Sequence, residues 1–496
     1  MNHFLRSLLI LAFTLPIASA SVGADELSLE EAIQNVLKRR PDLNISRIDT
    51  AIAAADKQRV QGLLDATING TMSASEERLP ISSNFQATET RNAEFSAGLS
   101  KPLSNGGTLA VQGSYSRTRQ VFVSPLASQL ARFNPAYRSQ IDVSYRHALL
   151  RGADRPDYSL GLESVEAQTS AALFDEHVVA RNLSLSTISA FYNLVADDIN
   201  VDIAEQAVKR AREILRYQKS RQEFGLIEQA DALQAEAFLA ARSTDLQRAR
   251  SQRRSDENAL SRLMQQDSTQ KIALAPPSLS ANRSIPDFDE AETLALMQRP
   301  DIKAIDARIK AAEADLSAAL DIDATQLDVV AQLGTRALNG KPGQAATSSL
   351  SVNDHFAALS LEMQDTWGRQ SARASIRKAE LARQRLSDLR RQTIELIRDD
   401  LSSAITAIET GLPNLSMARL QASAERKKYQ AELKRYRDGR SDTATLVQFE
   451  GELRNAELQE KLQQQTLQLA RIQLAWATGS LLKDLGIEFE SGMVQP

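Results

Sequence analysis

Cysteine is absent from the 496-residue chain. This absence excludes disulfide bonds, thiolate zinc sites, iron–sulfur clusters and cysteine nucleophiles. It is compatible with an oxidising compartment, but many chains of other compartments also lack disulfides. Cysteine usage therefore narrows the possible chemistry without fixing the location.

Helix breakers and aromatic residues are also scarce. The chain has 20 glycines, 14 prolines and only 5% aromatic residues, beside 42% hydrophobic and 25% charged residues. This composition indicates long helices with few interruptions and excludes a collagen-like or disordered chain. The 59 basic and 63 acidic residues give a net charge of -4. No basic surplus marks a nucleic-acid-binding protein, so we expect no nucleic-acid partner.

Only the start of the sequence contains a sustained apolar run. Arg6 precedes an apolar stretch at 8–18, and small residues follow at Ala18, Ser19 and Ala20. This pattern predicts a secretory signal peptide cleaved after Ala20, with Ala24 as the second choice. A membrane anchor is the alternative, but the run has about eleven residues where about twenty are needed. We therefore expect a mature protein that is either soluble outside the cytoplasm or spans a membrane as β-strands.

Two parts of the sequence repeat. Residues 31–43 recur at 290–302, an offset of 259, and each copy has an Arg-Pro-Asp motif that suits the first turn of a helix. A second match has an offset of 214, so the two halves carry an insertion of different length. This second match pairs Gly225 with Gly439, Gln234 with Gln448, Glu236 with Glu450 and Leu239 with Leu453.

Alternating apolar and polar residues replace the helical period between about residues 66 and 147. Shorter equivalents lie at 328–335 and 357–363, where Leu359, Leu361 and Met363 share one face. A period of two predicts β-strands with one apolar face. Residues 104–107 predict a hairpin turn. The sequence leaves open whether the strands beside Asn105 lengthen the wall of a sheet or form an external loop.

The remaining segments predict very long helices. Residues 155–223 contain almost no glycine or proline, which allows a helix on the order of 100 Å long. A second helix follows to about 266, and the second half repeats the pair at 369–437 and 443–479. Residues 411–414 predict a kink. Side chains that repeat every seven residues predict a shared coiled-coil seam; they are Ala232, Leu239, Leu246, Arg253 and Leu260, and Leu446, Leu453, Glu460, Leu467, Leu474 and Leu481.

The long helices of the same chain are too narrow to cover the apolar faces of the strands. We therefore expect lipid to cover those faces. A sheet in lipid must close into a barrel. Four principal strands, at most six, fall short of the roughly eight that the smallest barrels use. Three chains with four strands each would supply twelve. The aromatic residues Tyr115, Phe122, Phe133, Tyr137 and Tyr145 suit either an interfacial girdle or ordinary packing.

The expected fold is thus a mixed α+β membrane protein. Duplicated long antiparallel helical hairpins form a coiled-coil α-barrel, and strands contribute to a trimeric, about twelve-stranded transmembrane β-barrel. The predicted segments are a signal peptide at 1–20, first-repeat helices at 21–65, strands at 66–150, a helical hairpin at 151–268, a linker at 269–286, second-repeat helices at 287–324, strands at 325–366, a helical hairpin at 367–482 and a C-terminal tail at 483–496.

The leader, the duplicated Arg-Pro-Asp motif, the strand pairs and the hairpin turns at Gly225 and Gly439 resemble the TolC-like outer-membrane efflux protein family. The resemblance covers nearly the whole mature chain. It implies a homotrimer in outer-membrane lipid that extends into the periplasm. It also implies an exit duct of a tripartite efflux or type I secretion system, docked to a periplasmic adaptor (membrane fusion) protein and an inner-membrane transporter. No cofactor, metal or catalytic residue is expected.

In that family the hairpin tips close the pore and contact the adaptor. The matching tip residues are Phe224, Gly225, Leu226 and Ile227 in the first half and Gly439, Arg440 and Ser441 in the second. The pore-gate candidates are Tyr436, Thr445, Gln448 and Asp231. Thr445 and Gln448 stand where the family commonly has aspartates. Asp231 could supply charge instead, or could be a helix-start carboxylate favoured by the helix dipole. A left-handed helix cap alone would also explain the glycines.

An enzyme and a soluble scaffold are the alternative functions. An enzyme is not expected, because His147, His177 and His355 lie far apart and no metalloprotease motif, phosphate loop or nucleophile elbow is present. A soluble periplasmic coiled-coil scaffold would have strands that are polar on both faces, unlike 357–363. Within the duct hypothesis, small-molecule efflux is favoured over protein secretion, and no Met/His cluster supports metal efflux.

Overall fold

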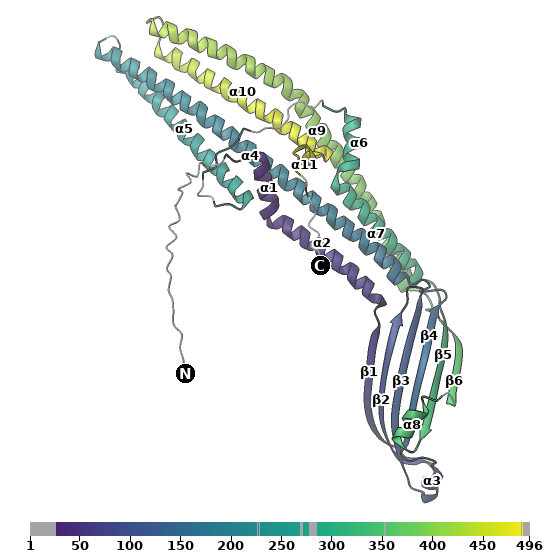
Figure 1. Cartoon of the computed structure of the whole chain (residues 1–496). Coiled ribbons are helices and arrows are strands. Elements are labelled where there is room, and N and C mark those ends of the chain that lie inside the picture. Colours follow the sequence, from purple (N-terminus) through teal and green to yellow (C-terminus); the bar gives the residue numbers. More distant parts are fainter. Residues whose placement is uncertain are drawn as a thin grey trace, which may run out of the picture.

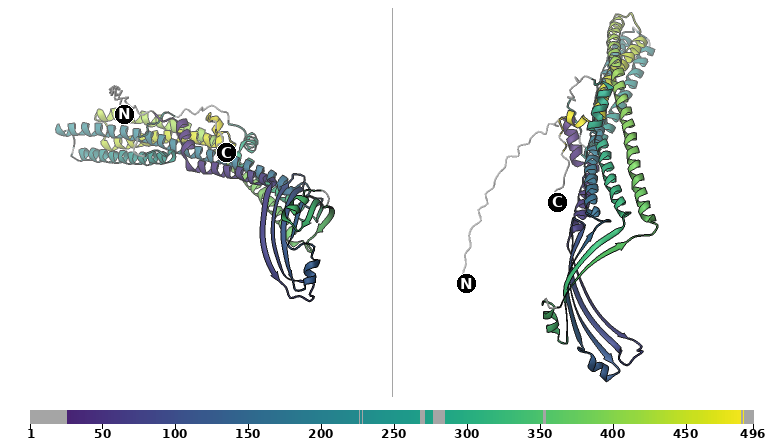
Figure 2. Two further views of the ribbon diagram at one scale, coloured as in Figure 1. Left: turned by 60° about the horizontal axis from the view of Figure 1, so that its bottom comes forward. Right: turned by 90° about the vertical axis from the view of Figure 1, so that its right-hand side faces the viewer.

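The computed structural model describes residues 26–225, 227, 229–267, 271–276, 285–351, 354–487 and 489. The predicted signal peptide at 1–20, Leu226, and most of the predicted linker and tail lie outside the described residues. The described chain is elongated, with a sheet at one end and long helices that run away from it to two hairpin tips (Figures 1 and 2). Across the described residues, no helix is both long enough and apolar enough to cross a membrane.

Short helix pairs open both halves, and the same motif starts the second helix of each pair. Helix α1 (Leu29–Arg39) leads into α2 (Pro41–Gln61) and the single turn η1 (Gly62–Leu64), while α6 (Phe288–Gln298) leads into α7 (Pro300–Ile322). In both pairs an extended arginine precedes a proline in the first helical turn. Proline lacks an N–H that this position does not need. The helix starts predicted from the repeat are therefore confirmed.

The sheet is antiparallel and has the strand order β1-β2-β3-β4-β5-β6. Its strands are β1 (Thr67–Arg78), β2 (Ala87–Pro102), β3 (Gly107–Phe122), β4 (Ala136–Ala148), β5 (Gln326–Asn339) and β6 (His355–Gln364). A short turn joins β2 to β3 at the helical end of the sheet. The connections at the far end are longer, and two of them contain the short helices α3 (Pro125–Leu130) and α8 (Pro342–Ser348) (Figure 1).

The sheet has six strands, where the sequence predicts four principal strands and at most six. The two additional strands flank the turn near Asn105, and both are full members of the sheet. Alternation along the chain predicts that these segments are strands, but it does not say which neighbours they pair with.

One face of the sheet is apolar along the part nearest the helices and carries the ion-paired Glu76, Arg78, Glu89 and Arg91 at its far end. The other face is polar. Paired residues align across all six strands, so that side chains of one kind lie side by side. One apolar row of paired residues consists of Ile68, Leu99, Val111, Val143, Leu333 and Ala357. The adjacent row on the opposite face contains Asn69, Gly98, Gln112, Asp142, Gly334 and Phe356. Ile68 and Met72 on the apolar face are 85% and 88% exposed, so the chain itself leaves this face largely uncovered.

Four long helices form two antiparallel hairpins. Helices α4 (Pro156–Glu223) and α5 (Gln229–Met264) make the first hairpin; α9 (Gln370–Arg437), α10 (Thr443–Thr478) and the short α11 (Leu481–Asp484) belong to the second half. Towards the sheet the neighbours run α2, α4, α7, α9; towards the tips they run α5, α4, α10, α9. Most positions of the predicted seven-residue seam are buried, including Leu246, Leu260, Leu446, Leu453 and Leu467.

Helix α9 continues through Pro413, in the segment 411–414 where the sequence predicts a kink. Pro413 and Glu409, whose carbonyl loses its helical donor, both lie on the exposed side. Water can therefore satisfy that carbonyl. Gly411 faces inwards, where a Cβ atom would lie 3.2 Å from Leu467 Cδ1.

Candidate functional site: the hairpin tips and the contacts between hairpins

Each long hairpin turns at a glycine with a left-handed backbone. Gly225 has a φ of 68° and Gly439 a φ of 73°. A Cβ atom on either residue would meet nothing within 4 Å. Glycine is therefore required by the backbone conformation that ends the helix, and not by lack of space.

The predicted adaptor-contact residues differ in exposure. Phe224 is 75% exposed at the first tip, whereas Ile227 is half-buried and Leu226 lies outside the described residues. At the second tip, Arg440 forms an exposed ion pair with Asp438. The hydroxyl of Ser441 instead donates a hydrogen bond to Glu432 within the same hairpin. Phe224 and Arg440 thus present side chains to the surroundings, and Ser441 stabilises the turn.

A side-chain cap begins the last long helix. The Asp442 Oδ1 atom accepts a hydrogen bond from the backbone N–H of Thr445 at 2.7 Å. This bond from the backbone lowers the pKa of the Asp442 carboxyl below its ordinary value. The gate candidate Thr445 is thereby part of the helix cap.

The other two polar gate candidates also lie near helix starts. The side-chain amide of Gln448 is exposed and donates to Glu452 at 2.9 Å, one turn along the same helix. Asp231 lies in the first turn of α5, where a carboxylate interacts favourably with the helix dipole. Within a single chain the structure does not bring Asp231, Thr445 and Gln448 into one cluster.

Tyr436 lies between the two hairpins and is only 2% exposed. Its ring packs against Tyr217 of α4 with a centroid distance of 5.3 Å. Its hydroxyl lies 3.4 Å from Thr443 Oγ1, which also accepts a hydrogen bond from Gln218 of α4. Burial raises the pKa of Tyr436, so the phenol stays protonated at neutral pH. In this structure Tyr436 therefore joins the second hairpin to the first.

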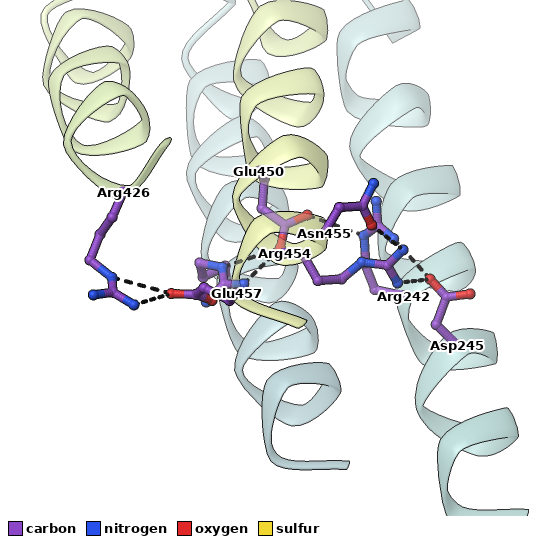
Figure 3. Close-up of polar contacts among 8 residues, drawn as sticks. Arg242, Asp245, Arg426, Glu450, Arg454, Asn455 and Glu457 are labelled. Carbon is purple, nitrogen blue, oxygen red and sulfur yellow. Dashed lines mark hydrogen bonds and ion pairs between the residues drawn. The ribbon is translucent and has the colours of Figure 1, made fainter. Parts of the chain in front are cut away.

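A buried ion-pair network makes a second connection farther from the tips (Figure 3). Glu450 of α10 has no exposed side-chain surface, and it contacts Arg210 of α4 at 3.0 Å and Arg242 of α5 at 3.2 Å. Asp245 of α5 then accepts hydrogen bonds from Arg242 at 2.8 Å and from Arg454 of α10 at 2.7 Å. We call Arg210, Arg242, Asp245, Glu450 and Arg454 the inter-hairpin network.

Sequence reasoning did not identify this network. The 214-residue repeat pairs Glu450 with Glu236, yet Glu236 is about half exposed and contacts Lys219 on the outer surface of the first hairpin. The difference arises because α10 lies between α9 and α4, whereas α5 lies at an edge of the helical layer. A local repeat gives no signal for such a difference in neighbours.

The residues of this site hold the two helical hairpins together. The network and Tyr436 bind the hairpins to each other through charge, hydrogen bonds and aromatic packing. In the described part of the chain, no three His, Asp or Glu side chains lie close enough together to hold a metal ion.

Comparison with known proteins shows which solved structures share this architecture. No protein-family model and no curated protein matches the chain. Among solved structures, the outer-membrane channel OprN is 18% identical, with a TM-score of 0.69 over 91% of this chain and 90% of that one. The CmeC outer-membrane channel of Campylobacter jejuni is 15% identical, with a TM-score of 0.65 over 91% of this chain and 86% of that one.

The open state of the MtrE outer-membrane channel of Neisseria gonorrhoeae is also similar. It is 17% identical, with a TM-score of 0.61 over 92% of this chain and 89% of that one. These likenesses extend from the sheet to the hairpin tips, because they cover nearly the whole of each chain. The chain has the fold of the TolC-like outer-membrane efflux channels, and the resemblance stated from its sequence is confirmed at the level of the fold.

Proposed function

We propose that this protein is an outer-membrane exit duct that works as a homotrimer and extends into the periplasm. The observation that carries the proposal is that one chain combines an amphipathic sheet with a curved layer of long helices, and that the edges of both lack partners among the described residues. The likeness to outer-membrane channels along nearly the whole chain supports the same function.

The sheet supports a location in lipid. Its apolar face exposes Met72, Leu359 and Met363 at 88%, 77% and 71%. Its outer strands β1 and β6 have no partner on their free edges among the described residues. Lipid covers an apolar face but offers no hydrogen bonds to a strand edge. Other copies of the chain must therefore supply the missing strands.

The helical layer also supports packing against neighbouring copies of the chain. Helix α2 lies at one edge of the layer and exposes Ile45, Ile48 and Ile52, which share one helical face, at 56%, 50% and 56%. Helix α9 lies at the other edge and exposes Leu381, Leu389 and Leu396, with polar side chains between them. Exposed apolar side chains on each edge suit packing between α9 of one copy and α2 of the next. Closing the sheet would then close the helices into a cylinder.

The tips are the proposed gate and docking site. A periplasmic adaptor would contact the exposed Phe224 and Arg440, and an inner-membrane transporter would supply the energy. The Tyr436 contacts and the inter-hairpin network would hold the hairpins in one arrangement until the adaptor shifts them. Small-molecule efflux is the favoured use of the duct, and type I secretion is the alternative.

The first test is fractionation of cells that express the full chain. We expect a heat-sensitive trimer in the outer-membrane fraction, measured by native mass after detergent extraction. A soluble monomer would refute the duct and favour the periplasmic scaffold instead.

The second test is export of a dye by cells that lack their own outer-membrane ducts and carry this chain with a chosen adaptor and transporter. We expect Phe224→Ala and Arg440→Ala to reduce dye export at unchanged duct level. Leu130→Ala is the control, because Leu130 is 69% exposed at the opposite end of the molecule. Equal export by all three variants would contradict the tip assignment.

A further inference from the structure

The hairpin formed by β2 and β3 is built into the sheet along its full length. Strand β2 pairs with β1 over all twelve residues of β1, and β3 pairs with β4 from Gly107↔His147 to Thr118↔Ala136. Both strands of the hairpin have 16 residues, and neither is shorter than its neighbours. The hairpin therefore spans the same height as the rest of the sheet.

The amphipathic pattern continues across the hairpin without a shift. One row of paired residues passes from Ile68 through Leu99 and Val111 to Val143. A hairpin that lay outside the membrane would gain nothing from keeping its apolar residues in this row. The alternation thus gives β2 and β3 the same two environments as the other strands, lipid on one face and the lumen on the other.

The turn between β2 and β3 is fixed at the junction of sheet and helices. The Arg155 guanidinium donates hydrogen bonds to the Gly107 carbonyl at 3.3 Å and to Thr108 Oγ1 at 3.1 Å. Gly106 packs so closely that a Cβ atom there would lie 2.9 Å from the Gly152 carbonyl oxygen. The hairpin consequently ends at the same level as β4, where the long helix α4 begins.

The two free edges are suited to each other. With six antiparallel strands, β1 and β6 run in opposite directions, and they have 12 and 10 residues. The apolar face carries the even-numbered residues of β1 and the odd-numbered residues of β6. Pairing between copies keeps the apolar face continuous only if even residues of β1 lie opposite odd residues of β6.

We propose that three copies close an eighteen-stranded barrel, three times six strands, by pairing β1 of each copy with β6 of the next. The inference rests on the proposed trimer. Each strand occupies about 6 Å of circumference at a tilt of about 40°, so the wall is about 36 Å across, against about 24 Å for twelve strands. Barrels of this strand number enclose an aqueous channel. Control of passage would therefore lie at the hairpin tips and not in the barrel.

Spin labels on single cysteines test the strand number, since the chain has no cysteine of its own. Ala97→Cys labels β2 and Ala331→Cys labels β5; each is the sixth residue from the helix-side end of its strand, and both lie on the apolar face. In an eighteen-stranded trimer, pulsed electron paramagnetic resonance should give an inter-copy distance of about 30 Å for both labels. A value of about 20 Å for Ala331→Cys, with a longer one for Ala97→Cys, would place the hairpin outside a twelve-stranded wall and overturn the proposal.

Disulfide trapping tests the pairing of the edges. Aligning the helix-side ends of β1 and β6 sets Met72 opposite Leu359. We expect oxidation to give covalently linked trimers for Met72→Cys combined with Leu359→Cys, or with cysteine two residues to either side at Ala357 or Leu361. Thr71→Cys with Leu359→Cys is the control on the opposite face and should stay uncrosslinked. Absence of crosslinks in all three Met72 pairs would overturn the edge pairing.

Native mass of each variant separates the two proposals. A variant that is not an outer-membrane trimer counts against the duct itself. A trimer that gives the shorter distance counts only against eighteen strands.

Discussion

Replacing Glu450 by glutamine should loosen the second hairpin from the first. The substitution keeps the size of the side chain and removes its charge. Glu450 is fully buried, and it is the acidic partner of Arg210 and one of two acidic partners of Arg242. After the substitution Arg242 keeps Asp245, but Arg210 faces a neutral amide.

The expected cost is about 3 kcal/mol, because loss of one partner from a buried ion pair destabilises by about 3–5 kcal/mol and Asp245 still balances one of the two arginines. If the contacts exist only while the hairpins are packed together, this energy shifts the equilibrium between closed and open tips. At about 1.4 kcal/mol for each tenfold change, the open population should rise by about a hundredfold.

Conductance of the purified full-length oligomer in planar lipid bilayers measures this shift. Glu450→Gln should open more often than the parent protein. Glu236→Gln is the matched control: it occupies the equivalent repeat position, but its exposed pair with Lys219 is worth at most about 1 kcal/mol. Adding Arg210→Gln to Glu450→Gln should recover stability, because it removes the unbalanced charge. Equal conductance and equal melting temperatures for Glu450→Gln and Glu236→Gln would refute the reasoning.

Three further substitutions test local features. Gly439→Val forces a β-branched residue into a left-handed backbone and should destabilise the tip by about 1–3 kcal/mol; limited proteolysis should cut it faster than a Gly343→Val control, which has no positive φ. Asp442→Ala removes a helix cap worth about 1 kcal/mol, so backbone hydrogen exchange should accelerate in the first turn of α10 and not in α5. Burial and the neighbouring Asp256 raise the pKa of Asp197 to about 7, above its unfolded value of about 4. The folded state then binds the extra proton, so this contribution to stability is lost as pH rises from about 4 to 7; Asp197→Asn should flatten the decline in melting temperature over that range, and an unchanged slope would contradict the assignment.

Local patterns in the sequence predicted much of the fold. Alternation marked the strands, the scarcity of glycine and proline marked the long helices, and the repeat placed turns at Gly225 and Gly439. Each of these features depends on residues close together in the chain. Backbone conformation and burial of one face depend on residues that are near in sequence, so both produce a periodic pattern in the sequence.

Features that depend on which elements become neighbours were not predictable in the same way. The segments beside Asn105 have the alternation of strands, but nothing local showed that they join the same sheet as the other four. Pro413 predicted a kink, but nothing local showed that the helix continues through it with the unpaired Glu409 carbonyl on the exposed side. The adaptor and gate roles assigned to the tips stay predictions, with Tyr436 now placed between the hairpins.

Glu236 and Glu450 are an example of what the sequence determines and what only the tertiary structure decides. The sequence by itself determined that both are glutamates at equivalent positions of a duplicated helical hairpin, since a repeat preserves spacing. Only the tertiary structure decided that Glu450 is buried between two arginines while Glu236 stays at the surface. The physical reason is that α10 packs between two helices and α5 lies at an edge, and the energy of a charge depends on what surrounds it.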